Sequence, residues 1–246
     1  MSKSFHEQLR RIGIVLHGNK IWISEPLSVV FVVPMVIFFF FLIFSILKNE
    51  SIIHHNNKVY ASLRAEKTEL SRQLLDLSAK ERIALALRGV VGATIAPSVF
   101  HQLVELVHAN SKTFGYDPLL VLSVIQVESF FVPSARGRYK DFRLSGALGL
   151  MQVKPETARE MAERLGMPAP KDEDLFKPEI NIALGIAYLT QCIGRFKSFK
   201  LGLLAYNQGP GVIKEHLQEN QPLSIDYYKR VLQKYFILKK AAAPRF

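Results

Sequence analysis

One glutamate, Glu128, occupies a position where a carboxyl group can act as an acid. Leu120, Val124 and Glu128 are spaced four residues apart, so a helix through them places the carboxyl in line with an apolar stripe. Glu128 is also the expected end of that helix, where the helix dipole disfavours a negative charge, and burial disfavours it again. Both effects raise the pKa, and a carboxyl that stays protonated near neutral pH can protonate a glycosidic oxygen. Taken alone, the position fits a partly exposed glutamate at a frayed helix end better than it fits a catalyst.

Three motifs follow Glu128-Ser129 along the sequence. They are GALGLMQ at 146–152, LFKPEINIALGIAYL at 175–189 and AYNQGPG at 205–211. In order and spacing these segments resemble the SLT domain of family 1 lytic transglycosylases, and YYKRV from Tyr227 resembles that family's closing helix. The resemblance covers about residues 98–240. Any one motif arises often by chance, whereas the ordered set is specific.

The resemblance implies a lysozyme-like, mostly helical lobe with a glycan groove and one catalytic glutamate, which maps onto Glu128. Such enzymes cut the β-1,4 bond between N-acetylmuramic acid and N-acetylglucosamine without adding water. Glu128 would first protonate the leaving oxygen. It would then take the proton from the muramyl C6 hydroxyl, which attacks C1 and closes a 1,6-anhydro ring. The substrate's own groups thus replace the second carboxylate of an ordinary glycosidase, and no motif surrounds Asp141, the nearest acid downstream.

The resemblance also implies which residues line the groove. They are Ser129, Gly149, Met151, Gln152, Tyr206 and Asn207. The Tyr206 hydroxyl is expected to point toward Glu128 or the sugar, because aromatic rings stack on sugars and a hydroxyl can orient a carboxyl. The alternatives are a core aromatic at Tyr206 and a helix end at Asn207, beside turn residues. No cofactor and no metal is expected.

The chain departs from the family pattern after the catalytic glutamate. Family members commonly carry a serine nine residues after it, where this chain has Gly137, followed by an inserted RYKDFRL. Either Ser134 or Ser145 is a candidate to replace that serine, and the role stays unassigned. Arg136 and the cations of the insertion, Arg138, Lys140 and Arg143, are candidates to meet the carboxylates of peptide stems. A solvated loop is the more frequent explanation of such a charge run.

The elements that must position these residues are helices. Signals from Ser98 onward are helical and no set of alternating strands is expected, so the predicted fold class is all-α. Proline at the first helical position marks three of the helix starts, at Pro118, Pro155 and Pro178, and Gly166 is expected as a left-handed cap. The expected helices cover 98–111, 117–128, 155–166, 178–192, 199–206 and 226–240.

An apolar run without charge precedes this lobe. Residues 27–47 match the roughly 30 Å thickness of a bilayer core, are apolar on every face and exceed the length of a signal peptide's apolar region. The predicted organisation is therefore a tail at 1–26, a transmembrane helix at 27–47, a helical stalk and linker at 48–97, and the SLT domain at 98–246. Leucines recur every seven residues in the stalk, but the second seam of a coiled coil is poor, which favours a single helix.

Composition excludes several classes of protein. The net charge of +11 is spread along the chain without a basic stripe interleaved with aromatics, so no nucleic-acid partner is expected. Cys192 is the single cysteine, which excludes an intramolecular disulfide, and the histidines show no spacing of metal ligands.

The sequence therefore predicts a membrane-anchored lytic transglycosylase that acts on peptidoglycan. Positive charges balance across the span, so the function sets the topology: a bacterial inner-membrane protein with its catalytic domain in the periplasm. A secretion, conjugation or pilus machine is the expected kind of client. The alternatives are a hydrolase of the same fold and a catalytically inactive glycan-binding scaffold.

Overall fold

The computed structural model describes residues 7, 10, 14–17, 20–23, 25–92, 95–139 and 141–243. The chain divides into two compact units, residues 1–72 and residues 73–246. Most of the predicted tail at 1–26 lies outside the described residues, as does Lys140 of the insertion.

The first unit contains a hairpin and the apolar part of a long helix. Strands β1 (Ile14–His17) and β2 (Lys20–Ile23) pair antiparallel. Helix α2 (Glu25–Val91) follows, with Pro34 inside it, and continues into the second unit. Its apolar part is long enough to cross a membrane, with a mean hydropathy of 2.6 and no part of that window buried. The prediction of one long apolar helix is confirmed.

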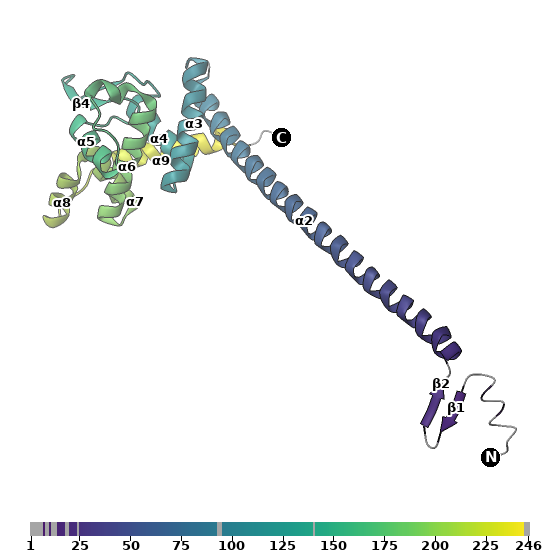
Figure 1. The fold of residues 1–246 in the computed structure, drawn as a ribbon. Coiled ribbons are helices and arrows are strands. Elements are labelled where there is room, and N and C mark those ends of the chain that lie inside the picture. Colours follow the sequence, from purple (N-terminus) through teal and green to yellow (C-terminus); the bar gives the residue numbers. More distant parts are fainter. Residues whose placement is uncertain are drawn as a thin grey trace. The chain divides into compact units, whose positions relative to one another are not determined.

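The second unit is a mostly helical lobe (Figure 1). After the end of α2 its elements are α3 (Pro97–Phe114), α4 (Pro118–Ser129), β3 (Arg136–Arg138), β4 (Leu144–Leu148), α5 (Pro155–Arg164), the 3-10 helix η1 (Asp172–Phe176), α6 (Pro178–Phe196), α7 (Phe199–Gln208), α8 (Pro210–Gln218) and α9 (Asp226–Ala241). The predicted fold class is confirmed.

Several helix ends follow local rules. The Asp117 side chain accepts a hydrogen bond from the Leu119 amide at 3.0 Å, and Pro118 occupies the first turn of α4. Gly166, just after α5, has a φ of 65°, as expected of a left-handed cap. By contrast, α3 starts at Pro97 without a side-chain cap from Ser98, because proline itself suits the first turn.

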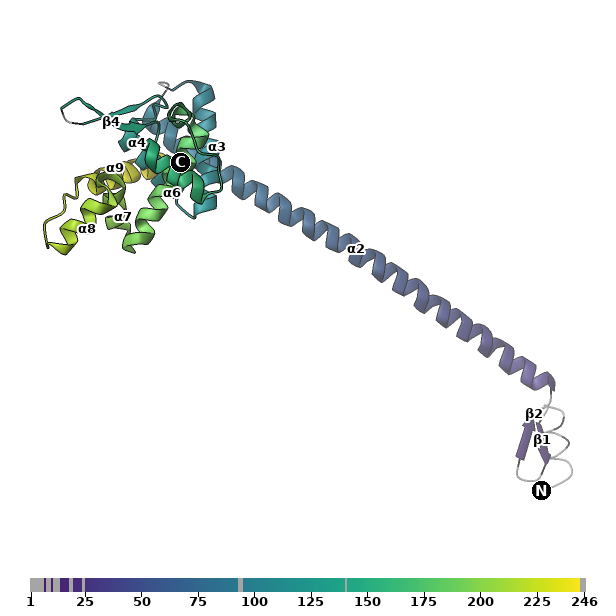
Figure 2. The same cartoon turned by 60° about the vertical axis from the view of Figure 1, so that its left-hand side comes forward.

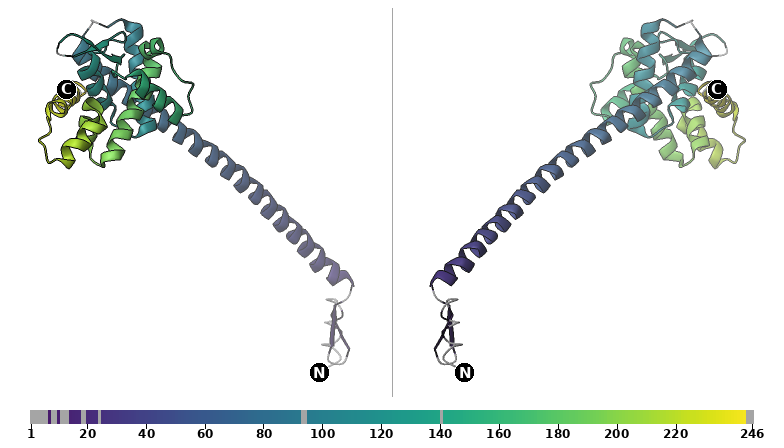
Figure 3. Two further views of the ribbon diagram at one scale, coloured as in Figure 1. Left: turned by 90° about the vertical axis from the view of Figure 1, so that its left-hand side faces the viewer. Right: turned by 90° about the vertical axis from the view of Figure 1, so that its right-hand side faces the viewer.

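Two elements contradict the sequence-based expectations. The insertion forms the antiparallel hairpin β3–β4, which extends from the lobe in Figure 2, although no strands were expected there. Its strands are too short to show alternation. Near its tip the Tyr139 amide donates to the Arg143 carbonyl, and the Phe142 amide donates to the Tyr139 carbonyl. The segment after Asn207 was expected to be a turn, but Pro210 begins α8, which lies beside α7 (Figure 3).

Packing in the lobe brings distant segments of the chain together. Helix α6 contacts α3, α5 and α7, while α9 packs along α4. The last turns of α2 also belong to this core, since Ile83, Ala86 and Leu87 are fully buried. The compact unit therefore starts at Gln73, within the segment predicted as a stalk.

Candidate functional site

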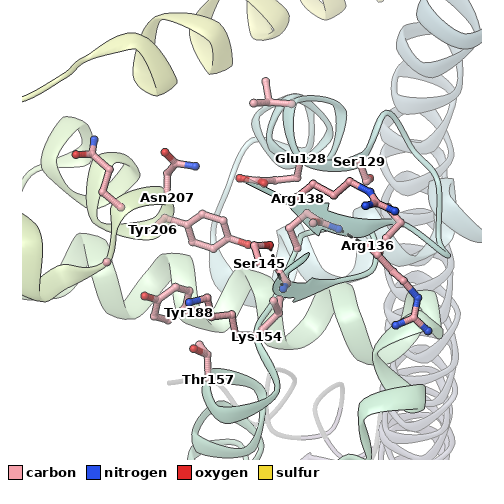
Figure 4. A pocket seen from close by; sticks show the side chains of 18 of the residues that line it. Glu128, Ser129, Arg136, Arg138, Ser145, Lys154, Thr157, Tyr188, Tyr206 and Asn207 are labelled. Carbon is pink, nitrogen blue, oxygen red and sulfur yellow. Dashed lines mark hydrogen bonds between the residues drawn. The ribbon is translucent and has the colours of Figure 1, made fainter. Parts of the chain in front are cut away.

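A pocket of about 790 Å³ opens in the second unit at the carboxyl end of α4. It is lined by residues of α4, the β3–β4 hairpin, the start of α5, and helices α6, α7 and α9. Five of the predicted site residues line it: Glu128, Ser129, Gln152, Tyr206 and Asn207. In Figure 4, the Glu128 carboxyl points toward the side of the pocket that Tyr206 and Asn207 occupy. Segments 79 residues apart in the chain, at Glu128 and Asn207, thus share one pocket.

Glu128 is fixed by the way α4 ends. Phe130 and Phe131 have φ values of 52° and 64°, in the left-handed region, so the helix stops immediately after Ser129. The Phe130 amide donates to the Gln126 carbonyl at 3.2 Å, which caps this end. The Glu128 side chain extends from the last turn, and its Oε1 accepts a hydrogen bond from the Tyr227 hydroxyl of α9 at 2.5 Å. The carboxyl is therefore held in one orientation from across the lobe.

The electrostatics of the site keep Glu128 protonated to an unusually high pH. Burial raises its pKa from the ordinary 4.5 to about 7, against the opposing effects of the Tyr227 hydrogen bond and the Arg230 charge. Burial and the nearby Glu128 carboxylate raise the pKa of Tyr227 well above its usual value, so Tyr227 remains a donor. A carboxyl with a pKa near 7 can give up a proton and take one back at neutral pH.

Two predicted residues connect α4 and α7 to the GLMQ segment. The Ser129 hydroxyl lies 2.8 Å from the Leu150 carbonyl and 3.1 Å from the Ile125 carbonyl, and can donate to either. The Tyr206 hydroxyl, which was expected to point toward Glu128 or the sugar, donates to the Met151 carbonyl at 2.6 Å. Both side chains line the pocket, and both also hold the backbone at Leu150 and Met151 in place.

The structure does not place Gly149 and Met151 in the groove, contrary to the prediction. Gly149 has a φ of 78°, and a Cβ there would lie 2.2 Å from the Leu175 carbonyl oxygen. The Met151 side chain is fully buried, and a Cβ on Gly185 would lie 2.6 Å from it. Both residues belong to a tightly packed turn behind the pocket wall, where the chain admits no larger side chain at Gly149.

Asn181, fully buried in α6, holds that turn together. Its Oδ1 accepts from the Met151 amide at 2.7 Å, while its Nδ2 donates to the carbonyls of Leu148 and Leu175 at 2.9 and 2.8 Å. These backbone groups come from two segments that are distant in the sequence. The Leu148 carbonyl also accepts from the Val153 amide at 3.0 Å, whereas the Met151 amide and the Leu175 carbonyl depend on Asn181. Asn181 lies within the motif LFKPEINIALGIAYL, but the spacing of that motif gives no sign of the groups that Asn181 binds.

The hairpin brings Ser145 next to Gly137. A Cβ on Gly137 would lie 2.3 Å from the Ser145 Oγ and 2.6 Å from the Gln152 Oε1. Gln152, with a φ of 50°, donates from Nε2 to the Gly149 carbonyl at 2.7 Å. Ser145 lines the pocket and Ser134 does not. Of the two candidates, Ser145 is therefore the serine in contact with the glycine position.

Sequence reasoning missed Tyr227 as the partner of Glu128. Tyr227 was recognised only as part of the closing motif, because nothing in the sequence relates α9 to α4. The pocket also receives Arg230 from α9, and Lys154 and Glu156 from the start of α5. Asp141 pairs with Arg143 at 2.8 Å on the exposed hairpin and does not line the pocket.

Comparison with known families gives a match to this lobe. The transglycosylase SLT domain model matches residues 105–229, half of the chain. That range includes Glu128, Asn181, Tyr206 and Tyr227.

Related proteins and solved structures carry corresponding names. The chain is 32% identical over 139 residues to membrane-bound lytic murein transglycosylase C of Histophilus somni (strain 2336), covering 51% of this chain and 36% of that protein. It is 29% identical over 149 residues to membrane-bound lytic murein transglycosylase E of Buchnera aphidicola, covering 56% and 68%. An inactive mutant of lytic transglycosylase Slt from Pseudomonas aeruginosa aligns with a TM-score of 0.41 and 26% identity, over 56% of this chain and 22% of that one. The chain spans about a third of the Histophilus relative.

Proposed function

Because the chain belongs to the transglycosylase SLT domain family, we propose that it is a membrane-anchored lytic transglycosylase of peptidoglycan. The observation that carries the proposal is Glu128: a carboxyl with a pKa of about 7, oriented by Tyr227, in a pocket of about 790 Å³. That pocket is within the range of volumes that hold small molecules or sugar units.

Glu128 performs both proton transfers in the proposed reaction. Its carboxyl proton passes to the glycosidic oxygen as the bond from that oxygen to C1 of N-acetylmuramic acid breaks. The resulting carboxylate then takes the proton of the C6 hydroxyl as the oxygen of that group bonds to C1. The products are a 1,6-anhydro end and a free sugar hydroxyl, and Glu128 regains its proton. No water is consumed.

Neighbouring side chains have distinct parts in this proposal. Tyr227 orients the carboxyl and, by donating to it, stabilises the carboxylate formed in the first step. Ser129, Gln152, Tyr206 and Asn207 form the walls that bind the glycan. Ser145 supplies the hydroxyl that the family carries at the Gly137 position, since its Oγ lies against that glycine.

We place the lobe in the periplasm, anchored in the bacterial inner membrane by residues 27–47 of α2. The relatives named as membrane-bound and the apolar length of α2 support an anchor. The periplasmic side is where peptidoglycan lies. An anchored lobe cuts only wall within its reach, which suits local opening of the wall for a secretion, conjugation or pilus machine.

The chemistry of the product ends tests the proposed function. We expect the full chain in detergent micelles to digest purified peptidoglycan into fragments that mass spectrometry identifies as 1,6-anhydro-muropeptides. Fragments with reducing ends only would identify a hydrolase of the same fold and contradict the proposal. Intact strands that bind without being cut would identify a glycan-binding scaffold instead.

A further inference from the structure

The pocket around Glu128 carries more positive than negative charge. Four of the side chains that line it are cations: Arg136, Arg138, Lys154 and Arg230. Only two carboxyl groups, Glu128 and Glu156, line it in the described part of the chain. When Glu128 carries its proton, the excess of positive charge grows further.

In the described part of the chain, none of these four cations forms an ion pair with a carboxylate. Arg138 donates one hydrogen bond, from Nη1 to the Phe142 carbonyl at 3.0 Å, which leaves its other donors for a ligand. Arg143 on the same hairpin differs, because it pairs with Asp141 at 2.8 Å and lies outside the pocket lining.

Arg136 and Arg230 are turned toward aromatic rings. The Arg136 guanidinium lies 4.7 Å from the centre of the Phe176 ring, and that of Arg230 lies 5.8 Å from the Tyr227 ring. In Figure 4, Arg138 lies on the side of Glu128, while Lys154 lies on the opposite side of the pocket with Thr157 and Tyr188. Arg138 and Lys154 thus face the space in front of Glu128 from two sides.

In a strand that carries its peptide stems, the glycan offers these cations no anion, because its hydroxyl and N-acetyl groups are neutral and the lactyl carboxyl forms the amide bond to the stem. The peptide stem carries carboxylates, and it is attached to the N-acetylmuramic acid whose C1 Glu128 must reach. We propose that Arg138 and Lys154 bind the carboxylates of the peptide stem, so that the enzyme selects strands with acidic stems over strands whose stems are amidated or removed. This inference rests on the proposed function of the same pocket.

Defined glycan oligomers test the proposal. One oligomer carries stems with free carboxylates, a second carries the same stems with those carboxylates amidated, and a third carries no stem. We expect kcat/KM of the full chain to be about tenfold or more higher on the first than on the second, because charge-assisted hydrogen bonds are lost on amidation. Arg138→Gln and Lys154→Gln should each reduce that preference, and the double variant should bring the ratio near one.

Two controls separate charge from structure. Arg143→Gln removes a cation from the same hairpin outside the pocket, and it should leave the preference unchanged. Arg138→Lys keeps the charge but loses the fork of donors, so it should retain a part of the preference. Raising the salt concentration should reduce the wild-type preference, since ionic screening weakens exposed charge pairs.

Three results would overturn the inference. The wild-type enzyme could cut the oligomers with free and with amidated stem carboxylates equally well. Alternatively, the double variant could keep the full preference for free carboxylates. The stem-free oligomer carries a lactyl carboxylate. If Arg138→Gln and Lys154→Gln lower kcat/KM on this oligomer as much as on the oligomer with free stems, the two cations bind the lactyl carboxylate and not the stem. If no oligomer is cut, the proposed function fails, and calorimetric binding of the free and amidated oligomers to the Glu128→Gln chain then decides the inference by itself.

Discussion

Glu128→Gln should reduce the turnover of peptidoglycan by about a thousandfold or more, because the amide can neither donate the acid proton nor take one back. The substitution keeps the size of the side chain, and its amide oxygen can still accept the hydrogen bond from Tyr227. The measurement is the initial rate of release of soluble fragments from purified peptidoglycan by the full chain. A variant with more than about a tenth of wild-type activity would remove Glu128 from the role of catalyst.

Two other glutamates serve as comparisons. Glu163→Gln changes an exposed residue of α5 outside the pocket lining and should have little effect on the rate. Glu156 lines the pocket, so it is the carboxylate on which a mechanism with two acids would depend. A loss in Glu156→Gln as large as that in Glu128→Gln would favour such a hydrolytic mechanism over the proposed one.

Glu128→Gln also has a predicted effect on the free energy of unfolding. This effect distinguishes a loss of catalysis from a loss of folding. The folded state raises the pKa of Glu128 from 4.5 to about 7, so the folded lobe holds a proton that the unfolded chain releases between those pH values. Stability is therefore lost as the pH rises from about 4.5 through about 7, by at most about 3 kcal/mol. Glu128→Gln should lack this loss and should be at least as stable as the wild type at pH 8.

Asn181→Leu should lower the free energy of unfolding of the lobe by about 3 to 5 kcal/mol. The substitution leaves the Met151 amide and the Leu175 carbonyl buried without a partner, while the Leu148 carbonyl keeps the hydrogen bond from the Val153 amide at 3.0 Å. Leucine has a similar volume, so lost hydrogen bonds and not a cavity dominate the effect. Near-UV circular dichroism of the tyrosines during thermal unfolding, in micelles, reports on the lobe.

Asn110→Leu is the matched control for that experiment. Among the described residues, the Asn110 Nδ2 donates only to the Leu106 carbonyl of its own helix, at 2.8 Å, and the side chain is partly exposed. We expect a change of less than about 1 kcal/mol, as for most surface substitutions. Equal destabilisation by the two substitutions would show that the Asn181 network does not hold the turn.

The predicted parts of the fold are those set by local chemistry. Asp117 caps α4, prolines open α4, α5 and α6, and Gly166 ends α5, because each effect acts within one helical turn. The hairpin β3–β4 and helix α8 were missed for the opposite reason. The hairpin depends on pairing across an inserted loop, and Pro210 can stop one helix while starting the next.

The candidate site was predicted in part. Spacing located Glu128, yet the apolar stripe was not the reason for its burial, since α4 is enclosed on most faces by helices such as α9. The contacts of Tyr227 with Glu128 and of Asn181 with Met151 join residues 99 and 30 positions apart. Such contacts arise from tertiary packing, which no local pattern encodes. Met151 and Gln152 belong to the same motif, which does not indicate that Gln152 lines the pocket whereas the Met151 side chain is buried behind it.

Direct titration of Glu128 tests whether burial makes this one carboxyl an acid and a base near neutral pH. Carbon-13 NMR of glutamate side chains in the labelled full chain, with Glu128→Gln for assignment, follows each carboxyl with pH. We predict a signal that titrates near pH 7 and is absent from the variant, with turnover falling as the pH rises through that value. A Glu128 signal that titrates near the ordinary pKa of 4.5 would show that burial does not raise the pKa of this carboxyl.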